Sequence, residues 1–326
     1  MLIQIVLFLI ELAILSYGAD LLVKNSSSLA RSLGVKPIII GLTFVAFGTS
    51  APEFGVSFMA ALAKSESIAI GNIVGSNIAN IGLILGLASL FHPLEVEPKV
   101  LRRELPWVSG TAVLLWLLSF NGKIGWSEGV ILLIFFILFL LYCVRNALRG
   151  RTDSDSGTAV GNGGGNIDPL SKKPKERLKK SILSLIGLGL LLGSGTFLVR
   201  SAVNIAHALG ISELVIGLTI VSVGTSLPEL ATTVVAGFRK ESGLGVGNII
   251  GSNIFNTLWI VGFAVLVTTI SVQKISQWLD MPCMVMLSLL LIVFFKTGLK
   301  ISRLEGVLLL LLYCAYVASR FVIFPN

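Results

Sequence analysis

The chain has 326 residues, of which 54% are hydrophobic and only 13% are charged. Soluble globular domains carry about 25% charged residues, so this composition excludes a soluble domain and indicates a protein that crosses a membrane several times. In such a protein the net charge of +8 does not indicate a nucleic-acid-binding surface. The placement of lysine and arginine instead sets the orientation of the chain across the bilayer.

Apolar runs of about 20 residues, bounded by charged or turn residues, predict membrane-spanning helices. Five such runs precede the only long polar stretch and five follow it. They cover residues 2–24, 37–63, 68–91, 101–120, 126–146, 180–208, 213–238, 243–270, 278–296 and 303–323. We therefore expect an all-α polytopic membrane protein with ten transmembrane helices.

The runs divide the chain into a first membrane repeat at 1–146, a linker at 147–179 and a second membrane repeat at 180–326. The linker is rich in Gly, Ser, Asp and Lys and shows no apolar periodicity, which predicts a flexible segment. Because each half has an odd number of spans, the second half begins on the opposite side of the membrane. The two five-helix halves are therefore expected to form an inverted repeat.

Lysine and arginine placement predicts the orientation. With the N-terminus outside, 20 of the 25 basic residues fall on the inside, 4 fall outside, and Arg200 lies within a span. Cytoplasmic loops carry an excess of these residues. Both termini are thus expected outside and the linker in the cytoplasm, in the cell (inner) membrane of a prokaryote.

One polar motif occurs twice within these apolar spans. Gly-Thr-Ser-x-Pro-Glu at 48–53 returns 176 residues later at 224–229, and Gly-Asn-x-x-Gly-Ser-Asn-x-x-Asn at 71–80 returns at 247–256. Proline lacks an amide hydrogen and its ring clashes with the carbonyl four residues earlier, so each first segment predicts a broken helix. Backbone carbonyls just before the breaks, around Ala46 and Ser222, are expected to lose their helical partners.

The repeated motif brings two carboxylates and many neutral oxygens into the membrane, where ionisable groups usually mark function. Hard cations such as sodium and calcium prefer oxygen ligands. Two carboxylates carry a charge that one calcium ion or two sodium ions would neutralise. The candidate side-chain ligands are Thr49, Ser50, Glu53, Ser76, Asn80, Thr225, Ser226, Glu229, Ser252 and Asn256.

Several other motif residues have a structural alternative. Glycines at four-residue spacing commonly let membrane helices pack closely, which is the reading favoured for Gly71, Gly75, Gly247 and Gly251. Asparagine can instead hydrogen-bond between helices. For Asn72, Asn77, Asn248 and Asn253 both readings stay open.

The paired motifs resemble the α-1 and α-2 repeats of sodium/calcium exchangers, here at 41–86 and 217–262. The resemblance covers nearly the whole chain. It implies sodium/calcium antiport by alternating access, with the ten side chains above and the carbonyls of Ala46 and Ser222 as the metal ligands. It also implies that the first and sixth spans slide against the other eight. We expect a working monomer whose ions are cargo, with no cofactor.

The chain departs from some relatives at Asn256, where several exchangers carry Asp and potassium-dependent ones use that Asp for potassium. This departure disfavours potassium cotransport. A proton-coupled exchanger of calcium or another divalent cation remains an alternative, as does a passive cation channel. An intramembrane enzyme is not expected, because no His or Cys is placed to pair with Ser50 or Ser226.

Overall fold

The computed structural model describes residues 2–155, 174–209 and 222–322, which are mostly helical. The first half contains α1 (Leu2–Ser32), α2 (Pro37–Ile40), η1 (Gly41–Val45), α3 (Ala46–Thr49), α4 (Ala51–Leu62), α5 (Glu66–Ala79), η2 (Asn80–Leu85), α6 (Gly86–Phe91), β1 (Leu94–Glu95), α7 (Pro98–Arg103), α8 (Leu105–Leu118), β2 (Lys123–Ile124) and α9 (Trp126–Asp155). The second half contains α10 (Pro174–Ala208), α12 (Ser222–Gly224), α13 (Leu227–Phe238), α14 (Ser242–Ile254), η5 (Phe255–Ile260), α15 (Val261–Val267), β3 (Ile270–Ser271), η6 (Ser276–Asp280), α16 (Met281–Gly298), β4 (Lys300–Ile301) and α17 (Arg303–Val322).

Each of the ten segments expected to span the membrane contains helix. Residues 213–221 of the seventh expected segment lie outside the described residues. By length and composition, six described helices can cross a membrane, or up to seven if the bent pair Pro37–Thr49 and Ala51–Leu62 is one span. The architecture is that of a multi-pass helical membrane protein.

Three helices run beyond the expected spans. α1 continues to Ser32, past the apolar run that ends at residue 24, because its polar end packs against protein: Ser26 is buried and its Oγ donates to Ser184 Oγ of α10 at 3.3 Å. α9 continues to Asp155 and α10 begins at Pro174, so both flanks of the segment expected as a linker are helical. Hydropathy marks only the apolar part of a helix, which explains the difference. Residues 156–173 lie outside the described residues.

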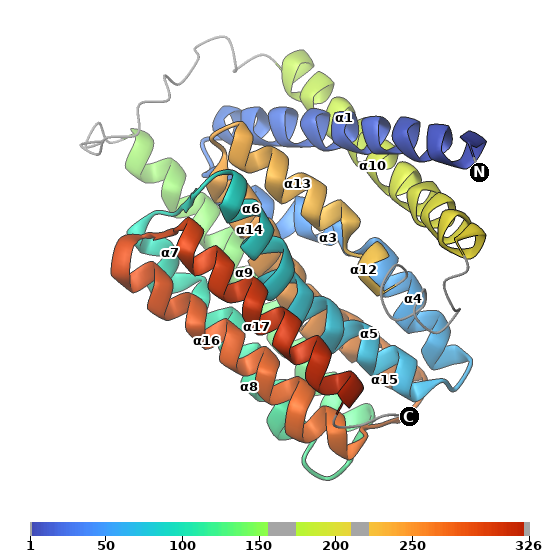
Figure 1. Cartoon of the computed structure of the whole chain (residues 1–326). Coiled ribbons are helices and arrows are strands. Elements are labelled where there is room, and N and C mark those ends of the chain that lie inside the picture. Colours follow the sequence, from blue (N-terminus) through green and yellow to red (C-terminus); the bar gives the residue numbers. More distant parts are fainter. Residues whose placement is uncertain (1, 156–173, 210–221, 323–326) are drawn as a thin grey trace.

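α1 and α10 lie together across one side of the bundle formed by the other helices (Figure 1). They touch where both carry glycine. A Cβ on Gly18 would lie 2.9 Å from the Leu191 amide nitrogen, and a Cβ on Gly187 would lie 2.6 Å from the Leu22 amide nitrogen. Only glycine permits such a close approach of two backbones. The crossing of the two long helices is therefore set by these two residues.

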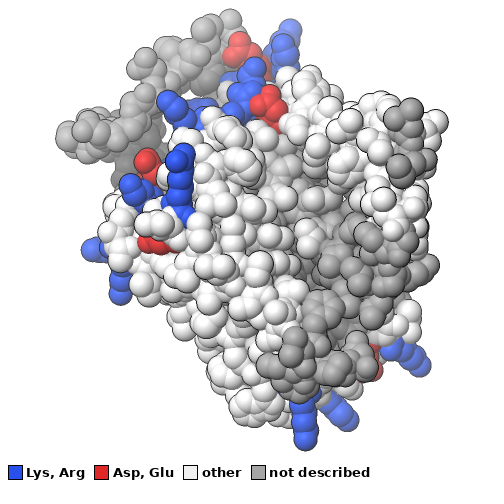
Figure 2. All heavy atoms as spheres, in the orientation of Figure 1, with Lys and Arg blue, Asp and Glu red and all other residues white. Residues whose placement is uncertain are grey.

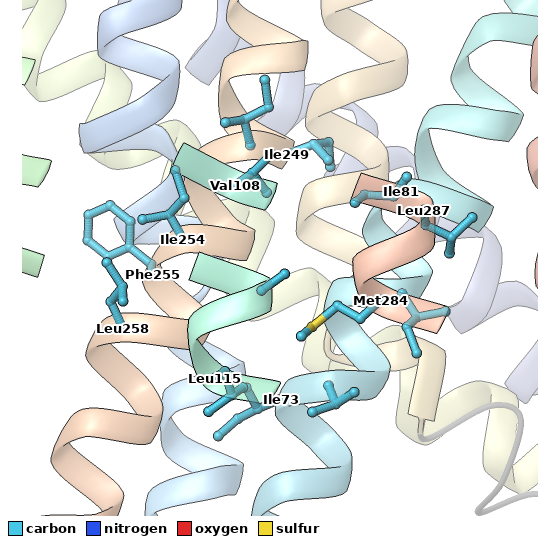
Figure 3. Packing of buried hydrophobic residues seen from close by; sticks show 14 of the residues in the cluster. Ile73, Ile81, Val108, Leu115, Ile249, Ile254, Phe255, Leu258, Met284 and Leu287 are labelled. Atoms are coloured by element: carbon cyan, nitrogen blue, oxygen red, sulfur yellow. The ribbon is translucent and has the colours of Figure 1, made fainter. Parts of the chain in front are cut away.

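The two copies of the Gly-Asn-x-x-Gly-Ser-Asn-x-x-Asn motif lie in the two most enclosed of the long apolar helices that the structure describes. The most apolar stretch of Glu66–Phe91 has 78% of its residues buried and that of Ser242–Val267 has 83%, against 22% for α1. Their apolar faces meet α8 and α16 in one core that includes Ile73, Ile249 and Met284 (Figure 3). The outer helices, in contrast, expose large apolar side chains such as Leu141 and Leu311. This arrangement of an apolar exterior around polar central helices suits a lipid environment.

The two halves repeat their local geometry. Lys64 and Lys240, 176 residues apart, both adopt positive φ (56° and 58°) just after α4 and α13. Each half also supplies one strand to each two-stranded sheet: β1 pairs with β4 and β2 with β3. Close glycine contacts follow the same scheme, since Gly86 packs against α17 at Gly306 and Gly262 packs against α9 at Gly129.

Charged side chains gather at two ends of the molecule, with a broad uncharged surface between them (Figure 2). At one end, ion pairs join α1 to the segment between α13 and α14. Arg239 pairs with Asp20, and Arg31 Nη1 lies 2.7 Å from Glu241 Oε1. The sequence offered no role for Asp20, because its partner lies 219 residues away.

We predict that Gly187→Val lowers the unfolding free energy by about 1–3 kcal/mol, because the added methyl groups force α1 and α10 apart. Thermal unfolding of the detergent-solubilised protein measures this. Gly189→Val is the matched control, since a Cβ at Gly189 would meet no described atom of another helix within 4 Å. Equal stability of the two variants would contradict the assigned contact.

Candidate cation-binding site

Two helix breaks place the two candidate carboxylates. Pro52 and Pro228 stand at the second position of α4 and α13, where a missing amide hydrogen is harmless. The residue before each helix leaves helical geometry: Ser50 has φ −80° and ψ 6°, and Ser226 has φ −92° and ψ 8°. Glutamate follows in the first turn. There the positive end of the helix dipole favours a carboxylate.

Each carboxylate accepts a hydrogen bond from the serine hydroxyl at the helix break of the other half. Ser226 Oγ donates to Glu53 Oε1 at 3.0 Å, and Ser50 Oγ donates to Glu229 Oε1 at 3.3 Å. Ser252 Oγ of α14 also donates to Glu229 Oε1 at 3.4 Å. Both glutamates are fully buried and close enough to repel each other electrostatically. The two copies of the motif therefore form one site between the halves.

Several buried oxygens of this site have no hydrogen-bond partner among the described residues. Buried polar atoms in folded proteins are nearly always paired, so a cluster of unpaired ones needs an explanation. A cation bound between them would supply the missing interactions. The unpaired oxygens are Glu53 Oε2, Glu229 Oε2, Ser76 Oγ, Asn80 Oδ1, Thr225 Oγ1 and Asn256 Oδ1.

Two further predicted ligands, Thr49 and the Ala46 carbonyl, already have hydrogen-bond partners. Thr49 is buried, but its hydroxyl donates to Asn248 Oδ1 at 3.0 Å. The expectation that the Ala46 carbonyl loses its helical partner is wrong, because it accepts the Ser50 amide at 3.0 Å. The break follows Ala46 rather than including it, so the first helical segment closes its last turn normally. Ser222 is the first residue of α12, and nothing is described of its side chain.

Asn77 and Asn253 join the two central helices. Each side-chain amide donates to the backbone carbonyl of the other, at 3.4 Å and 3.2 Å, and Asn77 Nδ2 also donates to Thr257 Oγ1 at 2.8 Å. Asn253 Oδ1 accepts from Asn80 Nδ2 at 2.9 Å. That last bond orients the Asn80 amide and leaves its oxygen available. Of the two readings open for these asparagines, the geometry supports interhelical bonding.

The glycines of the second copy have the packing role favoured from sequence. A Cβ on Gly247 would lie 2.6 Å from the Ile38 carbonyl oxygen, and one on Gly251 would lie 2.6 Å from the Leu42 carbonyl oxygen. These contacts seat α14 directly against α2 and η1.

The sequence did not predict the π-helical segments. η2 begins at Asn80, and η5 begins at Phe255, next to Asn256. A π-turn inserts one extra residue into a helix, which changes the direction of the side chains there and often occurs at functional sites. No residue type signals it, because it arises from packing between helices.

The chain matches the family described as sodium/calcium exchanger protein over residues 3–145 and 180–322. Among curated proteins it is 36% identical to a putative antiporter, CaxA, of Alkalimonas amylolytica, over 100% of both chains. It is 33% identical to the sodium/calcium exchanger MaX1 of Methanosarcina acetivorans, over 98% of this chain and 99% of that one.

The fold is also similar to solved structures. A structure of the sodium-calcium exchanger NCX_Mj soaked without sodium and calcium superimposes with a TM-score of 0.82 and 33% sequence identity. The alignment covers 98% of this chain and 99% of that one. Another, soaked with sodium and strontium, gives a TM-score of 0.81 at 34% identity, covering 97% and 98% of the two chains.

Two neighbouring residues of α5 test the site. Ser76→Ala removes an unpaired hydroxyl, so we expect unchanged stability but calcium binding weaker by about tenfold or more, since even outer-shell groups contribute that much to metal sites. Asn77→Ala removes interhelical bonds, so we expect an unfolding free energy lower by about 1–3 kcal/mol. Calorimetric titration with calcium and thermal unfolding measure the two effects. A Ser76→Ala variant that binds calcium normally would remove this residue from the site.

Proposed function

Because the chain belongs to the sodium/calcium exchanger protein family, we propose that it is a secondary antiporter that exchanges sodium for calcium across the membrane, with Glu53 and Glu229 shared by the two ions. The observation that supports this site best is the pair of fully buried carboxylates, each bonded to a serine of the opposite half and each with one oxygen unpaired.

The charge of the site explains why exchange is obligatory. Moving bare carboxylates through a low-dielectric barrier is costly, so the empty site resists the change of access. One calcium ion or two sodium ions neutralise two carboxylates. Since both cargoes need Glu53 and Glu229, they exclude each other. The transporter therefore changes the side from which its site is accessible only while calcium or sodium is bound. The flux of one ion is thus coupled to the flux of the other.

The full ligand set of this proposal combines both halves. In the first half it comprises the carbonyl of Ala46 with Thr49, Ser50, Glu53, Ser76 and Asn80. In the second half it comprises the carbonyl of Ser222 with Thr225, Ser226, Glu229, Ser252 and Asn256. The Ala46 carbonyl accepts the Ser50 amide at 3.0 Å and lies 3.4 Å from Thr49 Oγ1. It remains in the set because Thr49 has one hydroxyl proton and donates it at the shorter distance to Asn248, which leaves a lone pair of the carbonyl for an ion. The ions are cargo rather than resident cofactors.

We further propose ten transmembrane helices arranged as two inverted five-helix repeats. In support, β1 and β2 lie beyond opposite ends of α8, and each pairs with a strand of the second half. The matching glycine contacts at Gly86 and Gly262 agree with this symmetry. One chain then holds a complete site, so a monomer is sufficient.

The orientation that we propose follows from the basic residues, with both termini outside and the loop expected at 147–179 in the cytoplasm. The ion pairs of α1 with Arg239 and Glu241 then lie at the cytoplasmic end. In this arrangement α1 and α10 are the helices that slide, because they lie across the bundle and meet each other through glycine.

Calcium uptake into proteoliposomes tests the proposal. Vesicles loaded with sodium should take up calcium, and Glu53→Ala and Glu229→Ala should each abolish uptake, because the remaining carboxylate cannot balance either cargo. Glu95→Ala, which removes an exposed carboxyl of β1, is the control and should transport normally. Uptake driven by a proton gradient without sodium would instead indicate proton coupling, and uptake without any counter-ion would indicate a channel.

Asn256 gives a second prediction. Its amide adds no charge to the site, so two carboxylates remain and a potassium ion has no third acid to bind. Replacing potassium with choline on both sides of the membrane should leave the initial rate of sodium-driven calcium uptake unchanged. A rate that falls to background in choline would show that potassium is a cosubstrate.

A further inference from the structure

Asn72 and Asn248 occupy the same position in the two halves, 176 residues apart, but they have different partners. Asn72 bonds within its own half: its Nδ2 donates to Ser57 Oγ at 2.8 Å and to the Glu53 carbonyl at 3.3 Å. Asn248 bonds across the halves, because its Oδ1 accepts the hydroxyl of Thr49 at 3.0 Å. The pair therefore breaks the symmetry of the repeat beside the ion site.

The repeat contains the residues for the opposite pairing. Under the 176-residue offset, the observed bond from Thr49 to Asn248 corresponds to a bond from Thr225 to Asn72 across the halves. The observed bond from Asn72 to Ser57 corresponds to a bond from Asn248 to Thr233 within the second half. Neither is present among the described residues. Instead Thr225 Oγ1, Thr233 Oγ1 and Asn248 Nδ2 are buried without a hydrogen-bond partner.

These three atoms are the ones that the opposite pairing would use. A buried polar atom left unpaired costs more than an ordinary hydrogen bond gains, so proteins rarely retain one without a use. An arrangement that pairs Thr225 with Asn72 and Asn248 with Thr233 would satisfy all three. It would remove the bond of Thr49 to Asn248 and that of Ser57 to Asn72, and Thr49 would keep only its longer contact with the Ala46 carbonyl at 3.4 Å.

We propose that Asn72 and Asn248 are positioning residues that exchange roles when the transporter changes access. In the observed state, Asn248 holds Thr49 and Asn72 holds Ser57. In the opposite state, Asn72 holds Thr225 and Asn248 holds Thr233. This inference rests on the proposed exchange function. It assigns a hydrogen-bond partner to Thr49 in the observed state and to Thr225 in the opposite state.

Ser57 and Thr233 provide the test, because neither belongs to the proposed ligand set. Ser57→Ala removes a bond made only in the observed state, and Thr233→Val removes one made only in the opposite state. The two variants should shift the equilibrium in opposite directions, and a shifted equilibrium changes the apparent affinity at each face. Sodium-driven exchange in oriented vesicles gives the half-saturating calcium concentration at each face.

We expect the ratio of the two half-saturating concentrations to change by about fivefold in each variant, the effect of one hydrogen bond, and in opposite directions. The double variant should return the ratio close to that of the unaltered protein. Ser57→Thr and Thr233→Ser keep the hydroxyl and should keep the ratio.

Shifts in the same direction, or an unchanged ratio in variants that still exchange, would overturn the inference while leaving the exchange function intact. If one variant does not fold, the other still decides, because its ratio should change while that of its hydroxyl-keeping counterpart (Ser57→Thr or Thr233→Ser) should not. Absence of sodium-driven exchange in the unaltered protein would overturn both proposals.

Discussion

Burial of two like charges in one low-dielectric site is the constraint on which the rest of the structure depends. Glu53 and Glu229 are both fully buried, and one oxygen of each accepts a hydrogen bond from a serine hydroxyl of the opposite half. Such a pair stays ionised only beside compensating positive charge. The helix breaks place both carboxylates at positive helix ends, and the unpaired oxygens around them form a donor set whose chemistry suits hard cations.

The candidate site is built from residues of both halves of the chain. Neither half contains it, because each carboxylate is bonded by the other half and the central helices are joined through Asn77 and Asn253. Close glycine contacts let α14 lie against η1, and others let α1 lie against α10. The exposed apolar surface of the outer helices faces lipid. The polar groups are therefore concentrated where the halves meet, and relative motion of the halves acts directly on the ligands.

Much of this could be read from the sequence, because the membrane makes the rules strict. Pro52 and Pro228 each follow a helix break beside a glycine-containing motif, and a carboxylate within an apolar run usually marks function. Other features depended on contacts that no local pattern encodes. The Ala46 carbonyl keeps its helical hydrogen bond, and Asp20 forms an ion pair with Arg239, which is distant in the sequence. The π-turns that begin at Asn80 and Phe255 arise from packing between helices. Hydropathy also missed the polar ends of α1 and α9, since it reports lipid contact and not helix length.

The sequence by itself determined the membrane environment, the repeated motif, the two breaks and the oxygen character of the candidate ligands. Each of these follows from residue type and spacing alone. Only the tertiary structure decided that Ser50 meets Glu229 and Ser226 meets Glu53, that Asn77 and Asn253 bond the helices together, and that Asn72 and Asn248 have different partners. Two copies of one motif are identical in local preference, so their difference appears only once the halves pack against each other in a particular state.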